Sequence, residues 1–257
     1  MIGTIVNVVA VLAGSLAGMF FSRFLTDRIK QILMQALGLS VILIGISMAI
    51  TTKNILIVIG SMVLGGILGE MLDIEAWLDR VGEGLKRKVR SKSGTFVNGF
   101  VTASLLFCVG AMAVVGSFED GIRDNPSILY AKALLDGVAS VAFASTLGVG
   151  VMFSALSILL YQGALTFLGI YVEKFLVGAV ITELSATGGL LILGIGINLL
   201  TNGGDMIAAP KEKGDKSGAE KERVSVALPR VKIKTGNLLP ALLFAVIIAA
   251  IVERISK

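Results

Sequence analysis

Uncharged apolar segments about 20 residues long recur along this chain, and they constrain its fold more than any other feature. A helix that crosses the ~30 Å hydrocarbon layer of a bilayer needs about 20 predominantly apolar residues, because lipid offers the backbone no hydrogen-bond partners. The sequence predicts about eight such helices, at residues 2–21, 33–50, 55–72, 96–115, 129–148, 151–170, 186–200 and 238–252. The predicted fold class is therefore all-α, a polytopic transmembrane helical bundle.

Some of these boundaries rest on weaker signals. The connection at 148–150 carries no charge and the seventh segment is short, so six or seven spans are the alternatives. Residues 171–184 are apolar but too few to span, and we expect them to lie at the membrane interface. No charge precedes the apolar run at 2–21, unlike a cleavable secretory signal, so this segment is predicted to be a retained helix.

Composition favours lipid as the solvent for these helices. The chain has 55% hydrophobic and 16% charged residues, against roughly 25% charged residues in soluble proteins. It contains no histidine, the commonest general base and nitrogen metal ligand, and Cys108 is its only cysteine. An aspartic mechanism needs two carboxylates in contact, and only Asp136 lies deep in a predicted helix. We therefore expect no enzyme activity, no cofactor and no metal site.

Lysine and arginine indicate the orientation, because positively charged connections are retained on the cytoplasmic side. They are concentrated after the first, third and seventh predicted helices, which places both termini outside. The predicted organisation is a first repeat of three transmembrane helices (1–72), a cytoplasmic amphipathic connection (73–93), transmembrane helices four to seven (94–203), a mobile basic cytoplasmic loop (204–235) and a last transmembrane helix (236–257).

The two longer cytoplasmic connections differ in character. Apolar side chains of 73–92 fall on one helical face, so we expect this segment to lie along the inner surface against anionic lipid, with Trp77 at headgroup level. An ordinary helical connection is the alternative. Residues 205–234 are rich in Lys, Glu, Gly and Ser, which predicts a solvated linker. The alternating apolar residues of 224–233 are also compatible with short strands.

Two pairs of similar segments indicate an internal duplication. Gly3–Asn7 matches Gly94–Asn98 at four of five positions, and 42–47 resembles 192–198. The members of each pair are predicted to cross the membrane in opposite directions. Two inverted repeats would let one fold present the same site alternately to either side of the membrane. Shared helix-start chemistry is the alternative explanation.

Polar side chains inside spanning helices are costly and usually face a cavity or a partner. The main candidate is Asp136, with Lys132 four residues earlier on the same helical face. The pair predicts either a proton or cation site or a structural ion pair. Hydroxyls can line a polar path or bond back to their own helix. The remaining polar-path candidates are Ser140, Ser145, Thr146, Tyr161, Gln162, Asn7, Asn98, Asn198 and Asn237.

Pairs of glycines spaced four residues apart predict close helix crossings. Gly14 and Gly18 form one such face, and Gly65 and Gly69 form another. These faces serve packing either within one chain or between copies, so a homo-oligomer is one alternative.

Five strings of the sequence resemble the DUF554 family of bacterial membrane proteins. They are Gln35-Ala-Leu-Gly-Leu39, Leu68-Gly-Glu-Met-Leu-Asp-Ile-Glu75, Gly99-Phe-Val-Thr-Ala-Ser-Leu-Leu-Phe-Cys-Val-Gly-Ala-Met-Ala113, Phe143-Ala-Ser-Thr-Leu-Gly148 and Gly236-Asn-Leu-Leu-Pro-Ala241. The resemblance extends over nearly the whole chain. It implies a multi-pass protein of the bacterial inner (plasma) membrane, of uncharacterised role and suspected of transport. It carries over no active site.

The leading functional hypothesis is a secondary transporter or channel for an unknown small solute or ion. The chain lacks a Gly-x-x-x-x-Gly-Lys-Ser/Thr motif, so we expect coupling to a gradient rather than direct use of ATP. The alternative is a membrane scaffold or regulatory protein that recruits partners through the basic cytoplasmic loop. The lipid bilayer is an expected partner in both cases, and nucleic acid is not.

Overall fold

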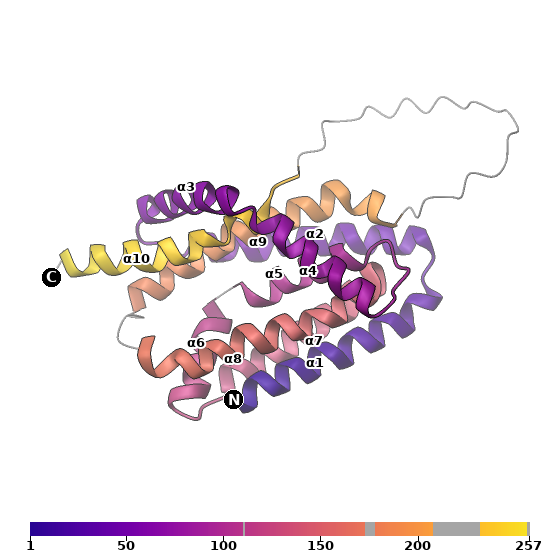
Figure 1. Ribbon diagram of the computed structural model, residues 1–257, viewed down its shortest axis with the longest axis horizontal. Coiled ribbons are helices and arrows are strands. Elements are labelled where there is room, and N and C mark those ends of the chain that lie inside the picture. Colours follow the sequence, from indigo (N-terminus) through magenta and orange to yellow (C-terminus); the bar gives the residue numbers. More distant parts are fainter. Residues whose placement is uncertain (110, 173–177, 208–231, 256–257) are drawn as a thin grey trace, which may run out of the picture.

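The structure, a computed structural model, describes residues 1–109, 111–172, 178–207 and 232–255 (Figure 1). The α-helices are α1 (Ile2–Phe21), α2 (Asp27–Ala49), α3 (Ile55–Leu72), α4 (Ile74–Lys88), α5 (Phe96–Cys108), α6 (Ala111–Ile122), α7 (Ser127–Leu147), α8 (Ser154–Val172), α9 (Gly178–Ile207) and α10 (Pro240–Ile255). Short 3₁₀ helices are η1 (Ser22–Phe24), η2 (Gly148–Phe153) and η4 (Thr235–Leu238). These ranges contain no strand, and the predicted all-α membrane bundle is confirmed.

The number of membrane crossings is bounded by helix length and hydropathy. Within the described residues, six helical segments are long and apolar enough to cross, or seven if α5 and α6, bent by 62° at their junction, form one span. One of the six covers 127–168. A straight helix would place Asp136 and Gln162 about 39 Å apart, yet both accept hydrogen bonds from Asn7. The chain therefore doubles back between α7 and α8, and a total of about eight crossings stays a prediction.

The reversal between α7 and α8 has a local cause in the sequence. Gly148 has φ +77°, which places it in the left-handed region that glycine adopts most readily, and α7 ends there. Thr95 Oγ1 donates a hydrogen bond of 2.8 Å to the carbonyl oxygen of Leu147, the last residue of α7. The turn is thus stabilised from the residue that precedes α5.

Glycine faces bring the helices together in pairs. Gly14 of α1 lies against the carbonyl oxygen of Gly137 on α7, with no room for a side chain between the two helices. Gly65 of α3 lies equally close to the backbone nitrogen of Ala241 on α10, and Gly45 of α2 packs against α9. Close backbone approach replaces the hydrophobic effect as the means of association between helices in lipid. Both predicted glycine faces are therefore used within the chain.

The helix directions follow from these contacts. Gly3 lies beside Leu129 and Gly18 beside Val141, so α1 and α7 run parallel. The α3–α10 and α2–α9 pairs run antiparallel. Figure 1 shows α1 and α10 running in opposite senses.

Two predicted segment boundaries were wrong. The segment 96–115, expected as one helix, is divided because Val109 is extended (φ −83°, ψ 123°), and α6 continues to Ile122. The segment 171–184 was expected at the interface. Residues 171 and 172 end α8, residues 173–177 lie outside the described part of the chain, and residues 178–184 form the first two turns of α9, where Val180 and Leu184 are buried. The amphipathic connection does form helix α4. The loop expected at 204–235 lies mostly outside the described residues, as do the short strands considered for 224–233.

Candidate functional site

Lys132 and Asp136 form a buried ion pair on one face of α7. They lie one helical turn apart, and the Lys132 ammonium contacts Asp136 Oδ2. The two residues are only 6% and 7% exposed. Burying two charges costs more free energy than their attraction returns unless further hydrogen bonds satisfy them. The predicted proximity of the two side chains is confirmed, and the remaining partners come from other helices.

Two amide side chains complete the cluster. Asn7 of α1 donates from Nδ2 to Asp136 Oδ2 at 3.0 Å and to Gln162 Oε1 of α8 at 3.3 Å. Both amides are fully buried. A carboxylate only accepts hydrogen bonds, so the Asn7 amide must turn its nitrogen toward Asp136. The same nitrogen also donates to Gln162, so the Gln162 amide must present its oxygen. Three helices thus meet at one point, and the four residues Asn7, Lys132, Asp136 and Gln162 are called the polar cluster below.

The polar cluster keeps unused hydrogen-bonding capacity. Asn7 Oδ1 and Gln162 Nε2 are buried and have no partner within the described part of the chain. The hydroxyl of Thr4, one turn before Asn7 on α1, is also buried without a partner. An unsatisfied buried polar group costs about 1–3 kcal/mol. A small polar ligand or water molecules would satisfy these atoms, so the cluster has the chemical character of a binding site.

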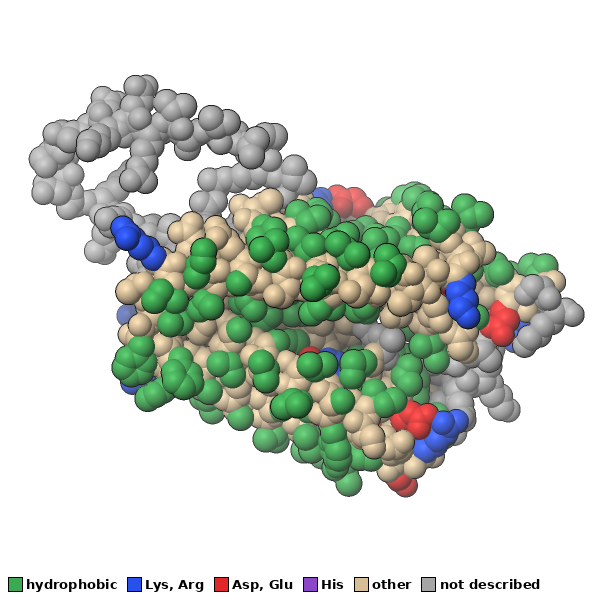
Figure 2. All heavy atoms as spheres, turned by 180° about the vertical axis from the view of Figure 1, so that it is seen from behind, with side chains coloured by type: hydrophobic (Ala, Val, Ile, Leu, Met, Phe, Trp, Pro, Cys, Tyr) green, Lys and Arg blue, Asp and Glu red, His purple; other side chains and the backbone are tan. Residues whose placement is uncertain are grey.

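The surroundings of the polar cluster are not completely closed. The side chains of Lys132 and Asp136 retain 8% and 10% exposure. Figure 2 shows a hollow on one face of the molecule, with one acidic and one basic side chain beside each other among apolar ones. Cys108, the last residue of α5, packs against the apolar core that also contains Phe143 and Ala144 of α7. The end of α5 therefore lies beside the helix that carries the ion pair.

The predicted hydroxyl series does not join the cluster. Ser140 donates to the carbonyl oxygen of Gly137, Ser145 to that of Ala142, and Thr146 to those of Ala142 and Phe143. All three therefore bond back to their own helix, the alternative considered for them. Tyr161 precedes Gln162 on α8 and is partly exposed. Asn98, matched to Asn7 by the repeat, is exposed on α5.

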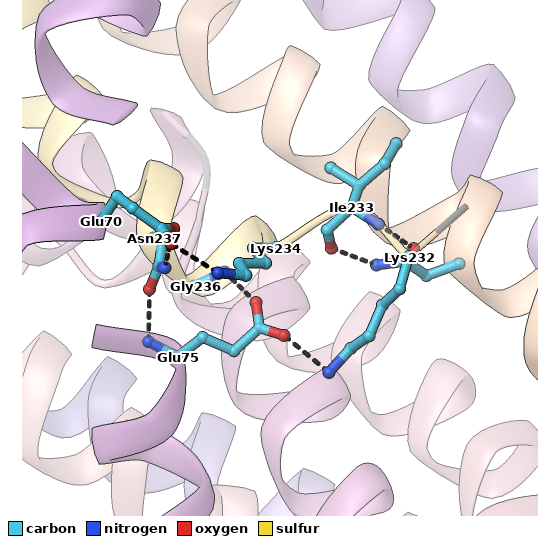
Figure 3. Close-up of polar contacts among 8 residues, drawn as sticks. Glu70, Glu75, Lys232, Ile233, Lys234, Gly236 and Asn237 are labelled. Carbon is cyan, nitrogen blue, oxygen red and sulfur yellow. Dashed lines mark hydrogen bonds and ion pairs between the residues drawn. The ribbon is translucent and has the colours of Figure 1, made fainter. Parts of the chain in front are cut away.

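Asn198 and Asn237 belong to a second polar network, at the chain segment that precedes α10 (Figure 3). Asn198 bonds both backbone groups of Ile233, accepting from its nitrogen at 2.9 Å and donating to its oxygen at 2.7 Å. Asn237 accepts from the backbone nitrogen of Glu75 at 2.6 Å and donates to Glu70 at 2.7 Å. Residues 232–237 are called the loop anchor below.

Two ion pairs reinforce the loop anchor. Lys232 contacts Glu75 at 2.7 Å and Lys234 contacts Glu70 at 2.5 Å. The hydrogen bond with Glu70 raises the pKa of Lys234 above its usual value. Since these contacts join α3, α4 and α9 to the start of α10, the network fixes the backbone rather than forming a cavity.

Besides Glu75, two buried acids were missed by the sequence analysis. Asp120 of α6 is 2% exposed; it accepts from the backbone nitrogen of Gly3 at 3.1 Å and pairs with the amino group of Met1 at 3.1 Å. Glu183 of α9 accepts from Thr52 Oγ1 at 2.6 Å and from the nitrogens of Lys53 and Asn54 at 2.9 and 3.1 Å. Glu183 is a lone acid within an apolar stretch, which is the signal that could have revealed it. Asp120 lies beside Glu119 in a charged helix end, so the sequence does not distinguish it from a solvated acid.

The arrangement defines the class of the protein as a multi-pass α-helical membrane protein with a buried polar cluster. Comparison with protein families gives its place within that class. Residues 2–206 match the family described as "Protein of unknown function (DUF554)", and the chain belongs to that family. The polar cluster lies inside the matched region and the loop anchor lies beyond it. The predicted resemblance to this family is confirmed.

Two relatives are similar over most of their length. The "Uncharacterized membrane protein YdfK" of Bacillus subtilis (strain 168) is 32% identical over 205 residues, which cover 78% of this chain and 86% of the relative. The "Uncharacterized protein YqgA" of Escherichia coli (strain K12) is 29% identical over 203 residues, covering 77% and 86%. No solved structure matches the chain significantly.

Proposed function

We propose that the protein is a secondary transporter or channel for a small solute or ion in the bacterial inner membrane, and that the polar cluster is its binding site. One observation carries the proposal. The Lys132–Asp136 ion pair of α7 lies with the amides of Asn7 on α1 and Gln162 on α8, and one donor (Gln162 Nε2) and one acceptor (Asn7 Oδ1) have no partner. Charged side chains are costly inside a membrane, so they usually face substrate or ion pathways. Most buried side-chain polar atoms in native proteins have a hydrogen-bond partner, so two unsatisfied amide atoms at one point favour a binding site.

Transport is proposed rather than catalysis because of the partners of Asp136. Its carboxylate contacts an ammonium and an amide, whereas acid–base catalysis by paired carboxylates needs a second carboxyl group in contact. Both charges lie on α7, and the two amides lie on α1 and α8. A small shift of α8 relative to α1 and α7, which glycine contacts hold together, would therefore open or close the cluster. The inverted repeat predicted from the sequence would provide such a movement.

Flux through purified protein in liposomes tests the proposal. We expect Asp136→Asn to abolish the flux of the transported species in a panel of radiolabelled small solutes and inorganic ions. Asp124→Asn is the matched control, because Asp124 is an exposed loop residue at which asparagine also tolerates the positive φ of 50°. Asn7→Ala should reduce flux and Asn98→Ala, at the exposed repeat position, should not. Undiminished flux in Asp136→Asn would remove the polar cluster from the mechanism.

A scaffold or regulatory role is the second candidate, and the loop anchor favours it. The anchor holds the chain immediately after residues 208–231 against α3, α4 and α9, so a partner bound to the basic loop could act on the bundle. Deleting residues 211–223 leaves every anchor residue in place. If the protein is a transporter, flux persists in this deletion. If it is a scaffold, partner capture is lost while the bundle stays folded.

A further inference from the structure

The hydrogen bonds of Asp136 are distributed unevenly between its two oxygens. The Lys132 ammonium and the Asn7 amide both contact Oδ2. Within the described part of the chain, neither a hydrogen bond nor an ion pair reaches Oδ1. The unpartnered Asn7 Oδ1 belongs to the amide that already contacts this carboxylate. The polar cluster therefore offers free oxygen atoms around a single negative charge.

We propose that the ligand of the polar cluster is a monovalent inorganic cation that takes the place of the Lys132 ammonium on Asp136, an inference that rests on the proposed function. Lysine carries its charge on a flexible four-carbon stem, whereas the short Asp136 side chain remains where α7 places it. Of the two partners, only the lysine can withdraw without a movement of the helix. The ligand that replaces it must carry the same charge, which excludes an anion.

The oxygen atoms nearby suit such a cation. Hard cations bind carboxylate, amide carbonyl and hydroxyl oxygens. The Asp136 carboxylate supplies Oδ1 and, once the ammonium has withdrawn, Oδ2. Asn7 Oδ1 supplies an amide oxygen, and Thr4, three residues before Asn7 on the same face of α1, carries an unpartnered hydroxyl. All of these atoms lie on α1 and α7, which pack in close contact. The cation would thus be held between the two helices that the glycine contacts fix.

Charge balance selects a monovalent ion. With Lys132 in place the cluster has no net charge, and a monovalent ion that displaces the ammonium restores the same balance. A divalent ion needs additional carboxylates, and no group of three or more Asp, Glu, Cys or His side chains occurs among residues 1–109, 111–172, 178–207 and 232–255. Lys132 is in effect a tethered cation that neutralises the empty site. When no ligand is bound, the site can then change its orientation in the membrane while Asp136 remains paired with Lys132. An unpaired Asp136 carboxylate would be costly in the bundle.

Replacing the tethered cation provides the test. In Lys132→Gln, Asp136 has lost its internal partner, so a cation from solution should bind at least tenfold more tightly than in the unmodified protein. Because a ligand that binds only the folded state stabilises it, the melting temperature of Lys132→Gln should rise with Na⁺ or K⁺ concentration. It should not rise with N-methyl-D-glucamine at the same ionic strength. The double variant Lys132→Gln/Asp136→Asn should respond to none of these salts. An equal response to N-methyl-D-glucamine, or a response that survives in the double variant, would overturn the proposal.

A second measurement applies if Lys132→Gln does not fold. Unmodified protein on a solid-supported membrane should give a transient charge displacement after a jump in Li⁺, Na⁺ or K⁺ concentration. The transient should persist in Asp124→Asn and disappear in Asp136→Asn. Absence of any transient in the unmodified protein refutes the cation proposal.

The two proposals fail separately. Cation binding without flux of any solute or ion refutes transport and leaves the cation site standing. Flux of an uncharged or anionic solute, with no cation response in Lys132→Gln or in the charge-displacement measurement, refutes the cation site and leaves transport standing.

Discussion

The strongest quantitative expectation concerns the stability of the buried ion pair on α7. Lys132→Met leaves the carboxylate of Asp136 buried with Asn7 as its remaining donor. Asp136→Leu leaves the Lys132 ammonium buried without its acceptor. Removing one member of a buried pair typically costs about 3–5 kcal/mol, because the other charge is left uncompensated. Each single variant should lose stability by about that amount.

The double variant Lys132→Met/Asp136→Leu should behave differently. It contains no unpaired charge, and Asn7 keeps Gln162 as an acceptor. Replacement of a whole buried pair by apolar residues is often neutral or stabilising, so the double variant should lie within about 2 kcal/mol of the unmodified protein. If the two changes were independent, their losses would instead add to about 6–10 kcal/mol. The difference is the coupling that the structure predicts.

Unfolding of purified protein in bicelles by titration with a denaturing detergent, followed by circular dichroism, would measure these free energies. The Glu119–Arg123 pair of α6 is the control, because it has the same four-residue spacing and a contact of 2.5 Å but an Arg123 side chain that is 62% exposed. Arg123→Met should cost only about 0–1 kcal/mol. A loss below about 1 kcal/mol in Lys132→Met, or strict addition of the two single losses, would contradict the burial on which the reasoning depends.

Four further expectations follow from individual contacts. Gly65→Ala should lower stability by about 1–3 kcal/mol in thermal unfolding, because its Cβ would collide with the backbone of Ala241, whereas Gly60→Ala, whose nearest atom would lie at 3.8 Å, should not. Glu183→Ala should increase hydrogen exchange at Lys53 and Asn54, since it removes the acceptor of both nitrogens. The pKa of Lys234 is raised in the folded state, so its contribution to stability is complete below its unfolded pKa of about 10.4 and is lost only as the pH rises through the folded value. The loop anchor should therefore not open between pH 7 and 9, and hydrogen exchange at the Ile233 amide should change over that range only with its intrinsic rate. Trp77, the only tryptophan and 55% exposed, should be quenched by brominated lipid more strongly when anionic lipid is present.

Sequence reasoning located most of the helices because the physical requirement is local. Any crossing segment must bury about 20 residues of backbone in lipid, and hydropathy records that requirement directly. The pairing of Lys132 with Asp136 was equally local, since residues four apart share a helical face. The break after Cys108 was not predictable in the same way, because it lies between apolar residues with no proline or charge to mark it.

Assembly of the polar cluster depended on information that no single segment contains. Asn7 and Gln162 were both candidates, but nothing in the sequence indicates that α1 and α8 place them on the same carboxylate. The repeat suggested equivalence between Asn7 and Asn98, and only the first is buried. Asn198 and Asn237 were assigned to the same path and belong to the loop anchor instead. Similar residue type and position along a helix therefore did not predict similar surroundings.

The four buried acids of the described residues differ in what they hold, and this difference supports a functional role for one of them. Glu75, Asp120 and Glu183 each accept from at least one backbone N–H group, so each fixes the start of a helix or a connection. Asp136 contacts side chains alone, and its charged partner, Lys132, is attached through a flexible stem. A carboxylate that fixes the backbone cannot exchange its partner without loss of local structure. Asp136 can exchange Lys132 for another cation while α7 stays intact, which is what a site that repeatedly binds and releases a ligand requires.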